Sequence, residues 1–454
     1  MGIKHDFKCC FKPYWLAASL GVLGLLLNTA QATPQIQYWQ TDSGARVYFV
    51  PVDDIPMVDV RIVFDAGSAR DGFTPRKLAG TALMTNGLLA EGAAGRSAQQ
   101  LAENFANVGA QFSNGALKDM AWLSLRSLRE DKYLQPALNN LQAILNQPDF
   151  PEQAFQRERE RLKIAVKSKK QSPGAIASDR FYQELYRDHP YASPSEGTEQ
   201  SLSQLTRRDL QQFYQQYYVA RNAVISVVGQ LSRVQAEQLV DELLVDLPAG
   251  KAPQSLPEVA PLREAKTVQI DFPSAQSTVL MGQVGMARGD ADYLALYLAN
   301  HAFGGSGFGS RLMHEVREKR GLAYSAYSYF SPMAQAGPFQ IGLQTRNDQV
   351  EQALQVVRQE LHHYIAEGPG EDELQDSLKN ITGGFPLRID SNKKIVEYLS
   401  MIGFYQLPLD YLDTFVSRIN QQTRDNVHAA LQRRLHEDKM LTIIVGGKQT
   451  QGDN

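Results

Sequence analysis

Cysteine is almost absent from this sequence. Cys9 and Cys10 are the two cysteines among 454 residues, and both precede the apolar run Trp15–Leu27 near the N-terminus. If residues 1–32 are removed on export, the mature chain contains no cysteine. Disulfide bonds, thiol catalysis and thiolate metal sites are then excluded for the mature form.

The first 32 residues have the three parts of a signal peptide. A basic segment precedes the short apolar run Trp15–Leu27, and Ala30-Gln31-Ala32 is a small-x-small cleavage sequence. A retained membrane anchor is the alternative, but the apolar run is short for a membrane span. We therefore expect residues 1–32 to be a signal peptide cut after Ala32, and the mature protein to be periplasmic or secreted.

Long apolar runs and an excess of positive charge are lacking in the rest of the chain. We expect no stable membrane span after signal cleavage. The formal net charge is −3, and residues 1–32 carry three lysines and one aspartate, a net +2, so cleavage leaves −5. This mild acidity argues against nucleic acid as a partner.

Two distant segments share one pattern. Residues 205–229 align without gaps with residues 422–446, and each segment reads as a threonine-capped amphipathic helix followed by a buried strand that stops at glycine. The caps, Thr206 and Thr423, occupy the same place in their segments. Together with the matching order of earlier elements, this predicts an internal duplication.

The duplication predicts an α+β protein with two homologous α/β-sandwich domains. We expect an N-terminal domain over residues 33–247 and a C-terminal domain over residues 265–450, each within ordinary domain size. Residues 248–264 are rich in proline and small residues, which is typical of an interdomain linker. Within the first domain, the pattern predicts a long helical region over 134–166.

Residues 303–330, FGGSGFGSRLMHEVREKRGLAYSAYSYF, join a glycine-rich loop to a helix and a strand; we call them the glycine block. Ser310 is expected to cap the helix and Gly321 to end it, and residues 322–329 alternate like a strand. Glycines let another chain approach closely, so the block predicts a surface for an extended peptide. A turn that serves tight packing is the alternative. The predicted substrate-binding residues are Gly304, Gly305, Gly307, Gly309 and Arg311.

A duplicated α+β unit with G-S-R-L…R-E-K-R-G-L-A-Y-S in its second copy resembles the pitrilysin/insulinase family of zinc metallopeptidases. The likeness is to the two-domain branch that includes mitochondrial processing peptidase, and it also covers the H-P-Y…E-G-T segment at 189–198. It implies two similar domains and paired subunits enclosing a chamber in which a peptide adds to a sheet edge.

The resemblance also implies an H-x-x-E-H zinc motif, which this chain does not contain. In the matching segment, residues 80–92, the histidine positions are Leu83 and Gly87, and the glutamate position is Asn86. The third ligand position falls at Ala165. Leucine, glycine and alanine side chains have no lone pair for a metal, and asparagine is a poor base. We therefore expect no metal or other cofactor on this chain.

A relocated metal site is an alternative with little support in the sequence. His314-Glu315 begins like H-E-x-x-H, but the second histidine position is Glu318. His362-His363 lies in a helical segment that ends in polar residues. Helical histidines are seldom zinc ligands without a converging third group.

In two-subunit members of the family, the subunit without zinc donates an arginine and a tyrosine to its partner's active site. The resemblance assigns these roles to Arg317 and Tyr324. It implies a non-catalytic subunit of a heterodimeric periplasmic zinc peptidase, with a zinc-bearing paralogue and a peptide or unfolded protein as partners. The alternatives are a peptide-holding protein without proteolytic role and an autonomous peptidase with a relocated metal. From the spacing alone, Arg317 reads as a surface charge and Tyr324 as a strand aromatic.

Overall fold

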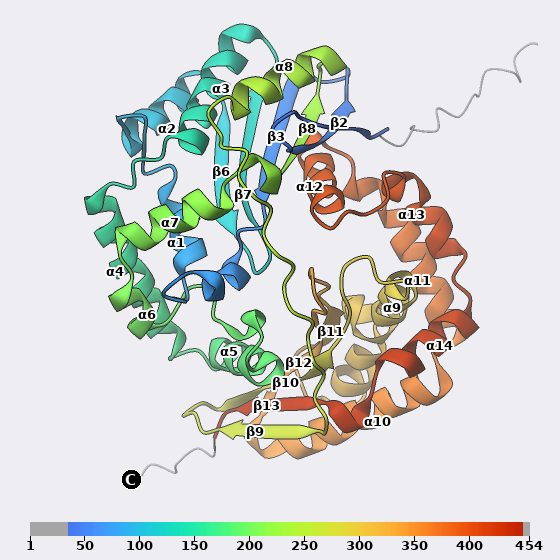
Figure 1. Ribbon diagram of the computed structural model, residues 1–454. Coiled ribbons are helices and arrows are strands. Elements are labelled where there is room, and N and C mark those ends of the chain that lie inside the picture. The colour runs from blue at the N-terminus through green and yellow to red at the C-terminus, as the bar shows by residue number, and fades with distance from the viewer. Residues whose placement is uncertain (1–34, 448–454) are drawn as a thin grey trace, which may run out of the picture. The chain divides into compact units, whose positions relative to one another are not determined.

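The first half of the chain builds a mixed sheet in the computed structural model, which describes residues 35–447 and thus not the predicted signal peptide. The strand order is β1-β2-β8-β3-β7-β6. The strands are β1 (Gln37–Gln40), β2 (Arg46–Pro51), β3 (Met57–Phe64), β6 (Gln111–Ala116), β7 (Ala121–Leu128) and β8 (Ala223–Gly229) (Figure 1). The helices are α1 (Thr81–Leu88), α2 (Ala98–Asn107), α3 (Asp131–Asn146), α4 (Glu152–Lys169), α5 (Pro173–Tyr186), α6 (Glu199–Gln204), α7 (Arg207–Tyr217) and α8 (Arg233–Leu244). A short β4–β5 pair (Gly92–Ala93 and Arg96–Ser97) precedes α2.

The second half builds a sheet with the order β11-β12-β10-β13-β9. Its strands are β9 (Lys266–Ile270), β10 (Gln276–Val284), β11 (Ala326–Phe330), β12 (Pro338–Arg346) and β13 (Leu441–Val445). Its helices are α9 (Tyr293–Asn300), α10 (Val350–Glu367), α11 (Glu371–Gly384), α12 (Asn392–Phe404), α13 (Tyr411–Asn420) and α14 (Arg424–Arg434).

The two sheets confirm the duplication. The order β2-β8-β3-β7-β6 of the first sheet recurs as β9-β13-β10-β12-β11 in the second. In both sheets the first pair is parallel, β2 with β8 and β9 with β13, and the other pairs are antiparallel. The threonine caps are also equivalent: Thr206 accepts a hydrogen bond at the start of α7, and Thr423 does so at the start of α14.

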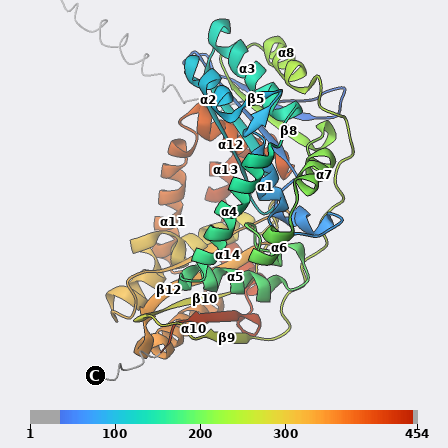
Figure 2. The ribbon, with the colours of Figure 1, turned by 90° about the vertical axis from the view of Figure 1, so that its left-hand side faces the viewer.

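Each half contributes one helix to the sheet of the other half. Helix α5 packs on β10 and β13, whereas α12 packs on β8, β3 and β2 (Figures 1 and 2). Small residues permit this close contact: a Cβ added at Gly403 of α12 would lie 2.5 Å from Cγ1 of Val224 on β8. The Arg46 side chain donates to the carbonyl oxygen of Gly403 at 2.9 Å. The two halves are therefore interlocked by packing.

The segment predicted as a linker, residues 248–264, contains no helix or strand but is well packed. Leu256 and Leu262 are buried with residues of both halves. The Arg70 guanidinium donates to the carbonyl oxygen of Gln254 at 2.8 Å, and the His189 ring contacts the carbonyl oxygen of Pro257 at 2.9 Å. The histidine of the H-P-Y segment thus holds this connection in place.

A buried carboxylate, Asp119, joins the two halves. Its Oδ1 accepts from the Tyr191 hydroxyl at 2.6 Å. Its Oδ2 accepts from the backbone N–H of Ala334 at 2.7 Å and from the Tyr405 hydroxyl at 3.0 Å. Burial raises the pKa of Asp119, although these three hydrogen bonds favour its ionised form.

Two expected elements differ from the structure. The helical region predicted over 134–166 is two helices, α3 and α4, because Pro148 and Pro151 interrupt the backbone hydrogen bonds between them. The strand predicted over 322–329 begins only at Ala326. Leu322 and Ala323 are consecutive buried residues, which breaks the alternation, and Thr345 donates its hydroxyl to the Leu322 carbonyl oxygen at 2.6 Å. Among residues 35–447, no helix combines the length and apolarity that crossing a membrane requires.

Candidate functional site

The glycine block begins as an extension of a buried helix. Helix α9 runs into a π-helical turn, His301–Gly305, and a 3₁₀ turn, Gly307–Gly309, follows. Ser310 then starts the charged helix as predicted, with its hydroxyl oxygen 3.4 Å from the N–H of Met313. Gly321, at φ +61°, ends that helix in the left-handed conformation that favours glycine.

The first two glycines of the block lie in tight contacts, Gly304 with edge strand β11 and Gly305 with helix α9. A Cβ added at Gly304 would lie 2.3 Å from Oγ of Ser328 on β11, and one added at Gly305 would lie 2.8 Å from Nδ2 of Asn300. Asn300 also donates to the Ser328 carbonyl oxygen at 3.1 Å, and the Ser328 hydroxyl donates back to Asn300 Oδ1 at 2.8 Å. The outer edge of β11 is therefore covered at Ser328.

The other two predicted glycines have open surroundings. A Cβ at Gly307 would meet no atom within 4 Å, and one at Gly309 would meet only the Ser306 hydroxyl at 3.7 Å. Between them, Phe308 leaves 70% of its surface exposed. Packing accounts for Gly304 and Gly305 but leaves Gly307 and Gly309 accessible to another chain.

Arg317 and Tyr324, the two residues that the resemblance assigns to a partner's active site, lie together near the surface. The Arg317 guanidinium lies 5.0 Å from the ring centre of Tyr324 and 4.8 Å from that of Phe308. Tyr324 is 79% exposed. We refer to Phe308, Arg317 and Tyr324 as the arginine–aromatic cluster. We did not predict a role for Phe308 from the sequence. Its position between two glycines in a loop is nevertheless a pattern that favours an exposed aromatic side chain.

Within residues 35–447, Arg317 makes no ion pair and no side-chain hydrogen bond, in contrast to its neighbours. Lys319 and Arg320 both bind Glu315, each at 2.6 Å. Although partial burial opposes ionisation, these two cations lower the pKa of Glu315 to about 2. Lys319 and Arg320 are thus paired with Glu315, whereas the side-chain N–H groups of Arg317 remain available as donors.

Arg311, predicted to bind substrate, is engaged within the fold. Its Nε and Nη2 atoms bind the two carboxylate oxygens of Glu373 at 2.9 and 2.6 Å. Its guanidinium lies 4.9 Å from the ring centre of Tyr364. Glu373 also accepts from the N–H of Gly370 at the start of α11. Substrate binding by Arg311 would require it to exchange this bidentate partner for another.

The four zinc-motif positions lie on two neighbouring helices, α1 and α4 (Figure 2). Asn86 is 1% exposed; its Nδ2 donates to the Tyr218 hydroxyl at 3.1 Å, and its carbonyl oxygen accepts from Asn114 at 2.6 Å. Asn86 thus belongs to a polar network inside the N-terminal half. The other three positions are Leu83, Gly87 and Ala165.

These positions do not fit a zinc ion. Leu83 packs against the core of the first half, and Gly87 and Ala165 are exposed without a donor atom in their side chains. The relocated alternatives also lack a third ligand: His362 contacts Glu437 at 2.9 Å, and His314 lies 3.3 Å from Glu315. In the part of the chain that the structure describes, no three His, Cys, Asp or Glu residues are grouped to hold a metal.

Two family models match the chain side by side. The model described as insulinase (peptidase family M16) matches residues 51–199, and the peptidase M16 inactive domain matches residues 204–381. The chain belongs to the M16 peptidase family. The insulinase match contains the four empty zinc-motif positions, and the inactive-domain match contains the glycine block. The resemblance to the pitrilysin/insulinase family and the two-domain α+β fold are thereby confirmed.

Some relatives of this M16 chain are named as proteases, and others are named as inactive or non-peptidase proteins. A crystal structure described as a peptidase M16 inactive domain from Pseudomonas fluorescens is 40% identical, with a TM-score of 0.87, and the match covers 91% of this chain and 98% of that one. A non-peptidase homolog of Helicobacter pylori is 26% identical over 72% of this chain and 75% of its own. An uncharacterized zinc protease of Streptomyces coelicolor is 28% identical over 79% of this chain and 78% of its own. Membership in the family therefore does not by itself assign a peptidase activity.

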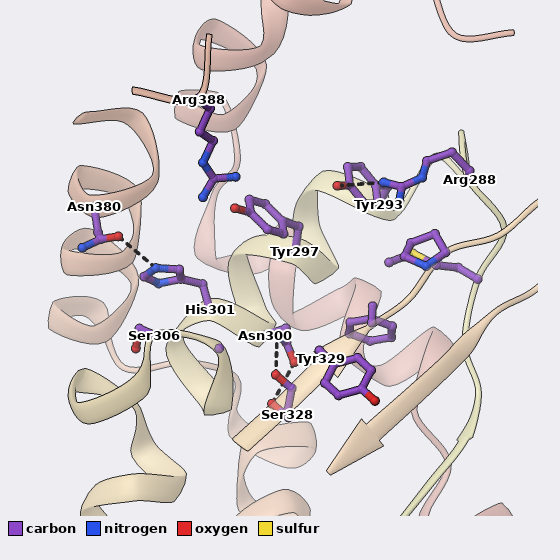
Figure 3. Close-up of a pocket in the computed structure, with 14 residues that line it drawn as sticks. Arg288, Tyr293, Tyr297, Asn300, His301, Ser306, Ser328, Tyr329, Asn380 and Arg388 are labelled. Carbon is purple, nitrogen blue, oxygen red and sulfur yellow. Dashed lines mark hydrogen bonds between the residues drawn. The ribbon is translucent and has the colours of Figure 1, made fainter. Parts of the chain in front are cut away.

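A cavity of about 510 Å³ opens beside the glycine block of this M16 chain (Figure 3). Gly305 and Ser306 of the block line it, with residues from α9, β11, α11 and the turn Pro386–Arg388. This cavity could not be recognised from the sequence because its polar residues come from segments up to 100 positions apart, between Arg288 and Arg388. No local motif connects them.

Proposed function

We propose that this chain is the non-catalytic subunit of a heterodimeric, periplasmic M16 metalloendopeptidase. It binds peptide substrate and completes the active site of a partner that carries the zinc. Arg317 supplies a guanidinium for a substrate carbonyl or carboxylate, and Tyr324 supplies a phenol for the developing oxyanion.

The observation that carries the proposal is the contrast between two sites on one chain. The zinc-motif positions have no ligands, whereas the arginine–aromatic cluster presents an exposed tyrosine and an arginine without an ionic partner in the described residues. An arginine that rests on two aromatic rings keeps its N–H donors free for another molecule. A cluster that served only this chain's stability would be expected to bury its aromatic rings.

The test combines this chain with a zinc-bearing M16 paralogue from the same cell envelope and measures cleavage of a fluorogenic peptide. The paralogue alone is expected to be nearly inactive, this chain alone inactive, and the mixture active. Arg317→Ala is expected to lower kcat/KM of the mixture by about 10²-fold, the magnitude typical of losing one charge-stabilising donor. Tyr324→Phe is expected to lower kcat with little change in KM.

Lys319→Ala is the matched control, since Lys319 lies two residues away, just after the end of the same helix, and already binds Glu315. Its mixture is expected to keep the wild-type rate. If the wild-type chain leaves the paralogue's rate unchanged, or if the Arg317 and Lys319 variants behave alike, the proposal fails. Peptide binding by this chain alone, with no effect on the paralogue, would instead support a peptide-holding protein.

A further inference from the structure

The cavity beside the glycine block has an unusual balance of charge. Two arginines and one histidine line it, Arg288, Arg388 and His301, and no aspartate or glutamate is among its lining residues in the described chain. Neither arginine forms an ion pair with a carboxylate within residues 35–447. At about 510 Å³ the cavity is within the size range of ordinary ligand pockets.

Aromatic rings, not carboxylates, support the two arginines. Tyr293 and Tyr297 stack on successive turns of α9, with ring centres 6.0 Å apart and planes 14° apart. The Arg288 guanidinium lies 5.4 Å from the Tyr293 ring centre, and that of Arg388 lies 5.9 Å from the Tyr297 ring centre. Figure 3 shows the two arginines approaching this tyrosine pair from opposite sides. Cation–π contacts stabilise the charges without consuming their N–H donors.

One of these donors is buried and unused. Nε of Arg288 has no hydrogen-bond partner in the described structure, whereas its Nη1 donates to the Tyr293 hydroxyl at 3.3 Å. Buried polar atoms rarely lack a partner, and an arginine N–H binds a carboxylate oxygen more strongly than a neutral acceptor. The described residues therefore leave one hydrogen bond of the Arg288 guanidinium unmade.

The cavity is also next to the surface proposed to receive peptide. Gly305 and Ser306 of the glycine block line it on one side, and Tyr329 and Phe330 of edge strand β11 line it on another. An extended peptide along the block could direct a side chain or its terminus into the cavity. Asn380 and Ser306 add neutral hydrogen-bonding groups to the lining.

We propose that this cavity binds a carboxylate of a peptide, held by Arg288 and Arg388. This proposal rests on the proposed function for the presence of a peptide, and it adds the preference for an acidic ligand. The carboxylate belongs either to an Asp or Glu side chain or to the peptide's C-terminus. Both sources present the same chemistry to the arginines.

Calorimetric titration of the purified chain with three N-acetylated peptides tests the proposal. The first contains one glutamate and ends in an amide, the second replaces that glutamate by glutamine, and the third keeps the glutamine but ends in a free carboxylate. At low salt, at least one carboxylate peptide is expected to bind about tenfold or more tightly than the neutral glutamine amide. The first and third peptides show which carboxylate is used.

Arg288→Gln and Arg388→Gln are each expected to reduce this preference about tenfold, and Arg346→Gln is the control. Arg346 is an exposed arginine outside the cavity that pairs with Asp348. Arg388 is exposed as well, so its variant keeps the test valid even if Arg288→Gln impairs folding. Equal binding of all three peptides, no binding of either carboxylate peptide, or a preference that survives in both cavity variants overturns the proposal. None of these results would contradict the proposed role of Arg317 in activating a zinc-bearing partner, because Arg317 does not line the cavity.

Discussion

The buried carboxylate of Asp119 offers a direct test of how the two halves are held together. The side chain is 4% exposed and accepts three hydrogen bonds, two of them from the C-terminal half, through Ala334 and Tyr405. Asp119→Ala leaves three donors without their acceptor, and the Tyr191 hydroxyl among them is buried. We expect it to lower the free energy of unfolding by about 1–3 kcal/mol, the range for leaving buried hydrogen-bond donors without their acceptor. Tyr405→Phe removes one donor and is expected to cost about 0.5–1.5 kcal/mol.

Urea unfolding followed by fluorescence and circular dichroism measures these changes. Asp348→Ala is the control because Asp348 forms an exposed ion pair with Arg346, and it is expected to change stability by less than about 0.5 kcal/mol. A loss below about 1 kcal/mol for Asp119→Ala would refute the reasoning, since the junction would then contribute little beyond surface contacts.

The same residue predicts the sign of a pH dependence. Because burial raises the pKa of Asp119 above its ordinary value of 3.8, the native state binds this proton more tightly than the unfolded state. Its contribution to stability is therefore complete below that ordinary value and is lost as pH rises through the raised native pKa. Asp119→Asn should remove this part of the slope when unfolding is measured from about pH 4 upward. An unchanged slope would show that other groups cause it.

Three further predictions concern the glycine block, the cavity beside it and the metal content of the chain. Gly304→Ala should destabilise the chain by about 1–3 kcal/mol because the added Cβ overlaps Ser328. Gly309→Ala is the control and should cost less than about 1 kcal/mol, since its Cβ has room. Equal losses of stability in thermal unfolding would contradict the packing role of Gly304. Burial lowers the pKa of His301, and the positive charge of Arg388 lowers it further. Arg388→Gln should therefore raise the pKa of His301 in an NMR titration. An unchanged pKa would show that the two groups do not interact. The purified chain should contain no stoichiometric zinc by metal analysis, and a near-stoichiometric amount would indicate a relocated site.

The duplicated fold could be predicted because its signals are local. Threonine caps, helical periodicity and a buried strand ending in glycine recur in α7–β8 and α14–β13. The exchange of α5 and α12 between the sheets could not be predicted in this way. An apolar helix face shows that a helix is buried, but it does not show which of two similar sheets will cover it.

The candidate site was predictable to the extent that its residues are close in sequence. Arg317 and Tyr324 are seven positions apart, and the Arg317 guanidinium lies 5.0 Å from the Tyr324 ring centre. Arg311, by contrast, binds Glu373, which lies 62 positions away in α11, so its engagement within the fold had no local signal. Arg288 and Arg388 depend in the same way on tertiary structure, since α9 places Tyr293 and Tyr297 between them.

The central claim is that this chain completes chemistry that takes place on another subunit. The most direct measurement is the rate of peptide cleavage by a fixed amount of the zinc-bearing paralogue as this chain is added. We expect a rise that saturates at one copy of this chain per copy of the paralogue. A rate that stays flat throughout the titration would contradict it.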